Sequence, residues 1–322
     1  MEIAPGIHLI PGMVGLRPLQ LLLLTGKSRC VLVDTGCAHH PEEIIFPYLR
    51  KIGLRPRDID MVINTHCDMD HCGGNNAVKI ANPNVQITCG EADRALVEDP
   101  QVMWNLRYNA YFNDHGIHYD EMTRAEIFKA MGNPQPVDQT WRGGETINLG
   151  DEWHVEIHHT PGHSNGHLAI LDPRSRTLLS GDAVHGSMYP DPQGQPSLCP
   201  TYLNVDSYVS TIRYLETLHI DCLADCHWPL QYGGGVRQFL AESLEFVDRA
   251  ETAVLTCLNQ SPEGITMRDL ILKVGPSLGA WPRAMDAELV YAIDGHLRFL
   301  LAKGAIAVAS GVRPIVFKIA SE

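Results

Sequence analysis

Short apolar runs separated by glycine, proline or polar residues dominate the first two-thirds of the chain. Runs of this length, bounded by turn residues, are typical of buried β-strands. Between them, apolar positions three and four residues apart predict helices, as in 41–52, which has Pro41 at its start and is followed by Gly53. The pattern predicts an α/β fold. The predicted strands are 7–10, 19–24, 30–33, 61–63, 85–88, 154–158, 168–171, 177–179 and 222–224.

Residues 92–140 have a different pattern, which is helical and rich in aromatic residues. One interpretation is a helical insertion that covers a functional site, in which case Trp104 and Tyr108 would contact the substrate. The alternative is a pair of ordinary packing helices. The sequence leaves both interpretations open.

A third pattern begins near residue 238. Helices are predicted over 239–258 and 286–303, and between them Thr266 and Asp269 form a capping box that opens a helix expected to end at Gly275. Two short strands, 305–309 and 315–319, follow. Three helices and a hairpin are the order of a winged helix, so the chain is predicted to divide into domains 1–237 and 238–322.

Charge and composition limit the kinds of partner and the cellular location that the sequence predicts. The formal net charge is −13, and acidic residues outnumber basic ones in 238–322 as well, which argues against nucleic acid. We therefore favour a structural, pocket-covering or dimerising role for the second domain, with a homodimer left open. No apolar run approaches the ~20 residues of a membrane span, and no secretory signal precedes the first strand. The nine cysteines lack the spacing of disulfide or zinc–thiolate sites, which indicates buried thiols and a cytoplasmic location.

Sixteen histidines direct attention to metal binding, and the motif His-x-Asp-x-Asp-His at 66–71 is the strongest signal. It directly follows a predicted strand, and a loop leaving a strand can direct alternate side chains to different sides. His66 and Asp68 can therefore face one cation while Asp70 and His71 face another. Four potential ligands in six residues disfavour the alternative, a polar surface loop.

Four further segments place a candidate ligand next to a predicted strand. Asp34 and Asp182 each end a strand, His163 lies on a turn before a strand, and His227 follows the 222–224 strand. His167, at the start of a strand, is interpreted as a structural histidine. These motifs are far apart in the chain, but the edge of one fold can bring them together.

In this order, the five segments resemble the motifs of the metallo-β-lactamase superfamily. The resemblance implies an αββα sandwich with a metal site at one edge. It implies two divalent cations, with Asp182 bridging them and Asp34 orienting a ligand by a hydrogen bond. The implied ligands are His66, Asp68 and His163, here called the first donor set, and Asp70, His71 and His227, here called the second donor set.

One departure concerns Asp68, because most of the superfamily has histidine there. Zinc is the expected metal, but the carboxylate makes the donor set harder, which moves the preference toward iron or manganese and keeps both open. Flavodiiron proteins and some nuclease-like members resemble this chain at that position.

The resemblance implies a hydrolase in which a metal-bound hydroxide attacks an ester-type bond of a small molecule, a thioester or a lactone as in glyoxalase II-like members. Asp70 would orient the hydroxide or transfer a proton, and Asp182 would complete the catalytic pair. His185 and Tyr189 follow Asp182 and are candidates for substrate contact. The alternatives are a phosphodiesterase or nuclease, and an iron-dependent enzyme that uses oxygen (a sulfur dioxygenase or a diiron enzyme).

Overall fold

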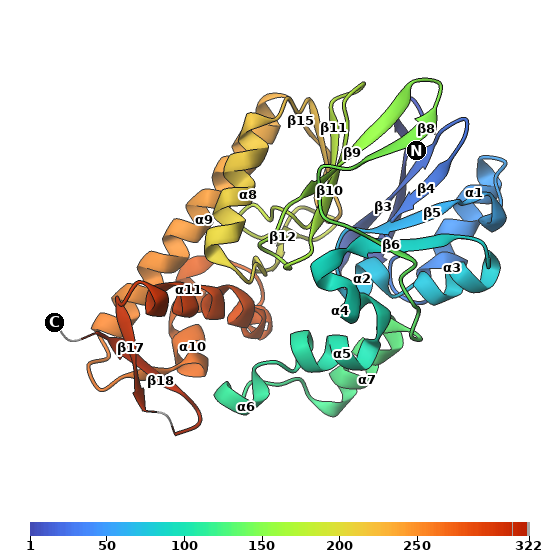
Figure 1. Cartoon of the computed structure of the whole chain (residues 1–322). Coiled ribbons are helices and arrows are strands. Elements are labelled where there is room, and N and C mark those ends of the chain that lie inside the picture. The colour runs from blue at the N-terminus through green and yellow to red at the C-terminus, as the bar shows by residue number, and fades with distance from the viewer. Residues whose placement is uncertain (311, 321–322) are drawn as a thin grey trace.

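Two β-sheets packed face to face form the centre of the molecule (Figure 1). The structure is a computed structural model of the chain and describes residues 1–310 and 312–320. The first sheet has seven strands in chain order, antiparallel from β1 to β4 and parallel from β4 to β7. Its strands are β1 (Glu2–Ala4), β2 (Ile7–Val14), β3 (Arg17–Thr25), β4 (Cys30–Val33), β5 (Met61–Asn64), β6 (Gln86–Gly90) and β7 (Gln139–Trp141).

The second sheet has six strands in the order β15-β14-β11-β10-β9-β8. Only the pair β11 and β14 is parallel. A separate two-stranded ribbon, β12 (Tyr189–Pro190) with β13 (Pro196–Leu198), follows β11. The strands of the second sheet are β8 (Thr146–Gly150), β9 (Trp153–His159), β10 (Leu168–Asp172), β11 (Thr177–Gly181), β14 (Cys222–Asp225) and β15 (Gln231–Tyr232).

Side-chain alternation along β3 shows why the sheets stack. Leu22 and Leu24 pack into the core between the two sheets, whereas Leu21 and Leu23 pack into the core under the outer helices. Successive side chains of a strand point to opposite faces, so an uninterrupted apolar run requires cover on both faces. The predicted strand over 19–24 therefore lies in the interior of a four-layer sandwich.

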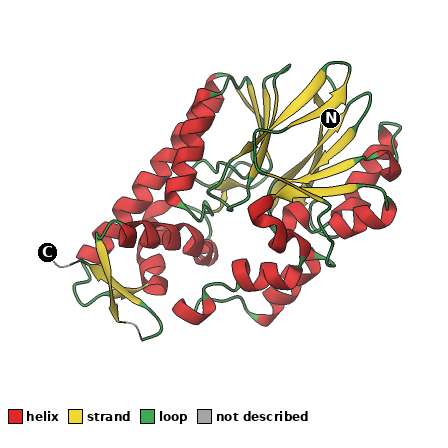
Figure 2. Ribbon diagram, viewed as in Figure 1, coloured by secondary structure: helices red, strands yellow, loops and turns green. Residues whose placement is uncertain are grey.

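Helices cover the outer face of each sheet (Figure 2), which confirms the predicted αββα sandwich. On the second sheet these are α8 (Val205–Thr217) and α9 (Gly234–Asn259). The elements between β4 and β6, on the side of the first sheet, are η1 (Pro41–Ile45), α1 (Phe46–Lys51), η2 (Pro56–Asp58), α2 (Met69–Cys72) and α3 (Asn75–Ala81).

Segment 92–140 is mostly helical and lies at one end of the sandwich, between it and the C-terminal helices (Figure 1). Its longest helix begins after Asp120, whose side chain accepts a hydrogen bond from the backbone of Thr123. The hydroxyl of Tyr108 accepts a hydrogen bond from the backbone of Met69, so the segment reaches the edge where β5 ends. Its elements are η3 (Glu91–Asp93), α4 (Arg94–Glu98), α5 (Pro100–Met103), η4 (Trp104–Tyr108), α6 (Phe112–His115) and α7 (Glu121–Met131).

The C-terminal region is helical, as predicted, and ends in a three-stranded sheet of order β16-β18-β17. Helix α9 runs without a break across residue 237, where the sequence places the domain boundary. Thr266 caps α10, since its hydroxyl accepts a hydrogen bond from the backbone N–H of Asp269, but the Asp269 carboxylate contacts that hydroxyl and α10 continues past Gly275 to Leu278. No helix within 1–310 and 312–320 is long and apolar enough to cross a membrane. The remaining elements are β16 (Ile265–Thr266), α10 (Met267–Leu278), η5 (Arg283–Leu289), α11 (Val290–Ala302), β17 (Ile306–Ser310) and β18 (Val316–Ile319).

Candidate active site

The candidate ligands meet where strands of both sheets end. Asp34 follows β4, His66 follows β5, Asp182 follows β11 and His227 follows β14. The ends of parallel strands lie at the same edge of a sheet, so residues far apart in the chain converge there. This edge brings all seven predicted ligands together.

The first donor set is compact. Nε2 of His163 lies 3.1 Å from Nε2 of His66 and 2.9 Å from Oδ2 of Asp68. Nε2 of His66 lies 3.5 Å from the same carboxylate oxygen. Three donor atoms at these separations match the edge lengths of a tetrahedral site whose metal–ligand bonds are about 2.0–2.2 Å.

The second donor set lies next to it. Nε2 of His227 is 3.5 Å from Oδ2 of Asp70 and 3.5 Å from Oδ1 of Asp182. Nε2 of His71 is 4.0 Å from Oδ1 of Asp70 and 3.6 Å from Oδ1 of Asp182. Asp182 also lies close enough to His66 and His71 for the three to bind one metal ion. Its carboxylate therefore lies between the two donor sets.

Each of the four histidines uses Nδ1 for a contact outside the centre and directs Nε2 toward the other donors. This fixes the ring orientation and leaves the Nε2 lone pair for a metal ion. The Nδ1 partners are Thr65 Oγ1 for His66 (3.1 Å), Asp34 Oδ2 for His71 (2.9 Å), Thr201 Oγ1 for His163 (3.4 Å) and the Pro18 carbonyl for His227 (2.8 Å).

Asp34 lies outside the two donor sets and contacts His71 and Thr65 through its carboxylate. Its backbone has φ of 62°, a conformation that side chains other than those of glycine, asparagine and aspartate rarely adopt. Its carboxylate accepts hydrogen bonds from the backbone N–H and the hydroxyl of Thr65, at 2.7 and 2.8 Å. Burial alone would lower the pKa of His71, but Asp34 and the other acids outweigh it and raise that pKa well above its usual value. Asp34 is therefore a positioning residue for His71.

Among the atoms of the seven predicted ligands, two buried polar atoms have no hydrogen-bond partner within the described residues. They are Nε2 of His71 and Oδ1 of Asp182, which face each other at 3.6 Å. Buried polar atoms are almost always paired, so this pair needs a partner that the protein itself does not supply. A divalent cation fits that need, because imidazole and carboxylate are its common ligands.

Arg107 of η4 lies beside the first donor set and was not predicted from the sequence. Nη2 lies 2.6 Å from Oδ2 of Asp68, Nε contacts Oδ1, and Nη1 donates to the carbonyl of His163 at 3.1 Å. Burial would raise the pKa of Asp68, but Arg107 and His163 outweigh it and hold that pKa well below its usual range. An isolated arginine in a helical segment gives no sequence signal for this contact.

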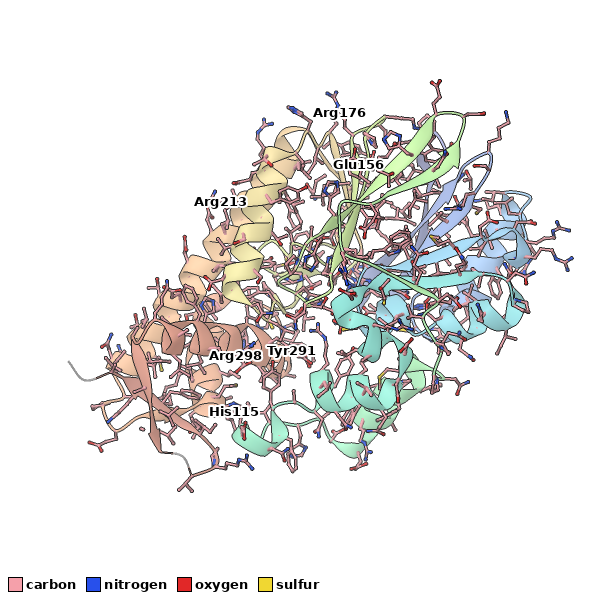
Figure 3. The ribbon with its side chains drawn as sticks, viewed as in Figure 1. His115, Glu156, Arg176, Arg213, Tyr291 and Arg298 are labelled. Carbon is pink, nitrogen blue, oxygen red and sulfur yellow. The ribbon has the colours of Figure 1, made fainter. Side chains whose placement is uncertain are left out.

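A cavity of about 210 Å³ lies over the donors. Segment 92–140 contributes Arg107, Tyr119 and Ile127 to its wall, and the C-terminal helices contribute Glu288 and Tyr291. Figure 3 labels Tyr291 where α11 faces segment 92–140. The other lining residues are Arg17, Asp68, Met69, Asp70, Tyr108, Thr123, His163, Asp182, Tyr189, Leu198, Thr201, His227 and Met285.

The predicted substrate contacts divide into two groups. Tyr108 and Tyr189 line the cavity. Trp104 and His185 are not among its lining residues. Trp104 packs in the core under the first sheet against the ring of Phe128, at 5.4 Å between centroids, because the indole is buried best there. His185 is fully buried, with its ring 4.9 Å from that of His163, and it forms a group with His163 and Asp182 whose donor atoms all lie within 4.8 Å of one another.

His167 and the cysteines take structural positions. Nε2 of His167 accepts a hydrogen bond from the backbone of Asp182, and its Nδ1 is paired with Thr160. Both ring nitrogens are occupied, so His167 is a structural histidine as the sequence indicates. All nine cysteines are buried free thiols.

The sequence matches the family model of the metallo-beta-lactamase superfamily over residues 17–227. The chain belongs to this superfamily and is a hydrolytic enzyme of it. The match begins at β3 and ends at His227, so it spans the strands that carry both donor sets.

Named relatives are distant. The chain is 25% identical over 219 residues to the acyl-coenzyme A thioesterase MBLAC2 of Gallus gallus, covering 62% of this chain and 67% of that protein. It is 25% identical over 115 residues to a hydroxyacylglutathione hydrolase of Hyphomonas neptunium, covering 35% of this chain and 44% of that protein. A metallo-beta-lactamase family protein from Thermus thermophilus has the same fold, with a TM-score of 0.74 at 20% identity over 98% of this chain and 99% of that one.

Proposed function

We propose that this enzyme hydrolyses an ester-type bond of a small molecule, a thioester or a lactone, with two divalent metal ions. The observation that carries the proposal is the convergence of three carboxylates and four imidazoles at one cavity. The two relatives named above, a thioesterase and a hydroxyacylglutathione hydrolase, support acyl chemistry.

The two donor sets would hold the ions, zinc in the first instance, with Asp182 shared between them. When bound, such ions lower the pKa of water toward neutrality and polarise a carbonyl oxygen. Asp68 adds a third carboxylate, which keeps iron and manganese as alternatives to zinc.

Asp70 is the proposed proton acceptor. It lines the cavity, and its Oδ2 lies 3.5 Å from His227. Burial would raise the pKa of Asp70, but His71 and His227 outweigh burial and lower that pKa. The carboxylate is therefore ionised and can accept a hydrogen bond from water. No serine or cysteine is among the described residues that line the cavity.

The cavity wall suits an acyl substrate that is partly apolar and carries a negative charge. Ile127, Leu198 and Met285 provide apolar surface. Arg17 lines the same cavity, and its buried Nε has no hydrogen-bond partner among the described residues. A carboxylate or phosphate of the substrate would satisfy that donor.

A substrate panel tests the proposal. Metal-free protein reconstituted with zinc, iron or manganese would be assayed on acyl-coenzyme A and glutathione thioesters, lactones and nitrophenyl phosphodiesters. We expect thioester or lactone hydrolysis that falls at least a hundredfold in Asp70→Asn. Turnover of phosphodiesters alone would replace the proposal with a phosphodiesterase. Substrate-dependent oxygen consumption with iron, without hydrolysis, would replace it with an oxygen-using enzyme.

A further inference from the structure

Arg107 engages the atoms of the first donor set on which a cation would depend. Its Nη2 lies 2.6 Å from Oδ2 of Asp68 and 3.0 Å from Nε2 of His163. These are two of the three donor atoms of that set. At Nε2 of His163 a donated hydrogen bond uses the one lone pair that a metal–ligand bond needs, and at Oδ2 of Asp68 it uses one of two. Arg107 therefore occupies, in part, the coordination capacity of the first donor set.

The second donor set has no such competitor. Among the described residues, the ion pairs of Asp70 and Asp182 are with His71 and His227, and none is with a lysine or arginine. Oδ1 of Asp182 and Nε2 of His71 have no hydrogen-bond partner in the described part of the chain. Among the described residues, the two donor sets thus differ in whether an arginine donates a hydrogen bond to a donor atom.

The position of Arg107 is held from the opposite side as well. Its guanidinium lies 5.3 Å from the centroid of the Tyr291 ring, a cation–π contact from α11. The hydroxyl of Tyr291 is in turn 3.4 Å from the hydroxyl of Tyr119, which donates to the carboxylate of Glu288. Because segment 92–140 and the C-terminal helices both hold this network, Arg107 cannot leave Asp68 without breaking other contacts.

Repulsion adds to this competition. An ion bound to Oδ2 of Asp68 at about 2.1 Å would lie within about 5 Å of Nη2, since Nη2 is itself close to that oxygen. The guanidinium stays protonated at every pH at which proteins fold, so the repulsion is permanent. In a buried site, like charges at this separation are screened little.

We propose that Arg107 makes the two metal sites unequal: the second donor set, with Asp182, binds one divalent ion tightly, and the first donor set binds another more weakly. Arg107 is a positioning residue in this scheme, because it acts through Asp68 and His163. The inference rests on the metal binding of the proposed function but not on the choice of substrate.

Titration of metal-free protein with Zn²⁺ against a chromophoric chelator tests the proposal. The variants are Arg107→Gln, which removes the competing charge, and Arg17→Gln, which removes a charge that lines the same cavity without pairing to a ligand. We expect two steps in the unmodified protein, at least tenfold apart in affinity. In Arg107→Gln the weaker step should strengthen at least tenfold, whereas Arg17→Gln should retain the two separated steps.

Three results would overturn the proposal: two equal steps in the unmodified protein, no change in Arg107→Gln, or the same change in Arg17→Gln. The last would mean that general charge, and not the pairing with Asp68, sets the affinity. Circular dichroism and thermal midpoints would establish that each variant is folded.

Asp68→Asn provides an independent test if Arg107→Gln does not fold. This variant removes a ligand of the first donor set only, so the tight step should remain unchanged and the weak step should disappear. Loss of the tight step would show that the tight ion sits in the first donor set, contrary to the proposal. Absence of zinc binding in every protein would contradict the proposed function itself, whereas two unequal steps without acyl hydrolysis would contradict only the substrate class.

Discussion

The hydroxyl of Tyr189 donates a hydrogen bond to Oδ2 of Asp182 at 3.0 Å, while Oδ1 of the same carboxylate faces both His71 and His227. The phenol thus holds the carboxylate that lies between the two donor sets. Hydrogen bonds to metal ligands typically change metal affinity or activity about 10–100-fold when they are lost.

Replacing Tyr189 with phenylalanine should therefore lower zinc affinity or kcat about tenfold without preventing folding. Zinc titration and steady-state kinetics would measure both. Tyr202→Phe is the matched control, because Tyr202 is equally buried but pairs with His296, away from the donors. Equal losses in the two variants would assign the effect to buried tyrosines in general.

Asp182→Ala should abolish hydrolysis and lower the metal content, since both donor sets lose a shared carboxylate. Metal analysis after dialysis would measure the loss. Asp172→Ala serves as the control: Asp172 is a buried acid of the same sheet that binds Trp153 and Ser175 and no candidate ligand. Asp172→Ala should be less stable but keep its metal. Unchanged metal content in Asp182→Ala would show that Asp182 does not bridge the two ions.

Asp34→Asn should reduce zinc affinity about 10–100-fold, because the amide cannot supply the charge that orients His71. Asparagine is the suitable replacement, since it tolerates the positive φ of 62° at this position. A chelator competition assay would measure the change. A zinc affinity equal to that of the unmodified protein would show that Asp34 does not position His71 for metal binding.

Gly90→Ala should destabilise the protein by about 2–3 kcal/mol. A Cβ there would lie 1.8 Å from the carbonyl oxygen of Gly166, on the turn that carries His163. Urea unfolding would measure the loss. Gly234→Ala is the control, because a Cβ at the start of α9 meets open space apart from the end of the Arg237 side chain. Similar stability losses in both variants would refute the steric argument.

His296 should make stability depend on pH. Burial lowers its pKa to about 4 from the ordinary 6.5, so between these values the unfolded chain binds a proton that the folded chain does not. Its contribution is complete above pH 6.5 and is lost as the pH falls toward 4, at about 1.4 kcal/mol per pH unit. Denaturant unfolding of metal-free protein should therefore show a shallower pH slope in His296→Gln, and an unchanged slope would contradict the assignment.

Most strand positions could be predicted from the sequence because they depend on local pattern, and the seven candidate ligands were proposed from the resemblance of their motifs to a known family. The apolar run at 19–24 could only be a covered strand, and the ligands follow strand ends. Strand β8 escaped prediction because its exposed and buried residues alternate without a continuous apolar run. Gly275 was taken for a helix end, but it permits the close approach of Asp286 from η5, a contact between elements that no local pattern reports.

The cavity residues escaped prediction for a similar reason. Arg107 on η4 is far along the chain from Glu288 on η5 and Tyr291 on α11, and only the docking of segment 92–140 against the C-terminal helices brings them together. Trp104 looked like a substrate contact because it is aromatic and close to Tyr108 in sequence. The local helical geometry instead directs it into the core under the first sheet.

The donors lie on α2 and on loops next to strand ends, whereas much of the wall that would recognise a substrate comes from η4, α7, η5 and α11. Reactivity and selectivity are thereby encoded in separate stretches of the gene. Exchanging Ile127 or Met285 should retune which molecules are accepted and leave the hydrolytic machinery intact, which makes this scaffold a convenient starting point for directed evolution.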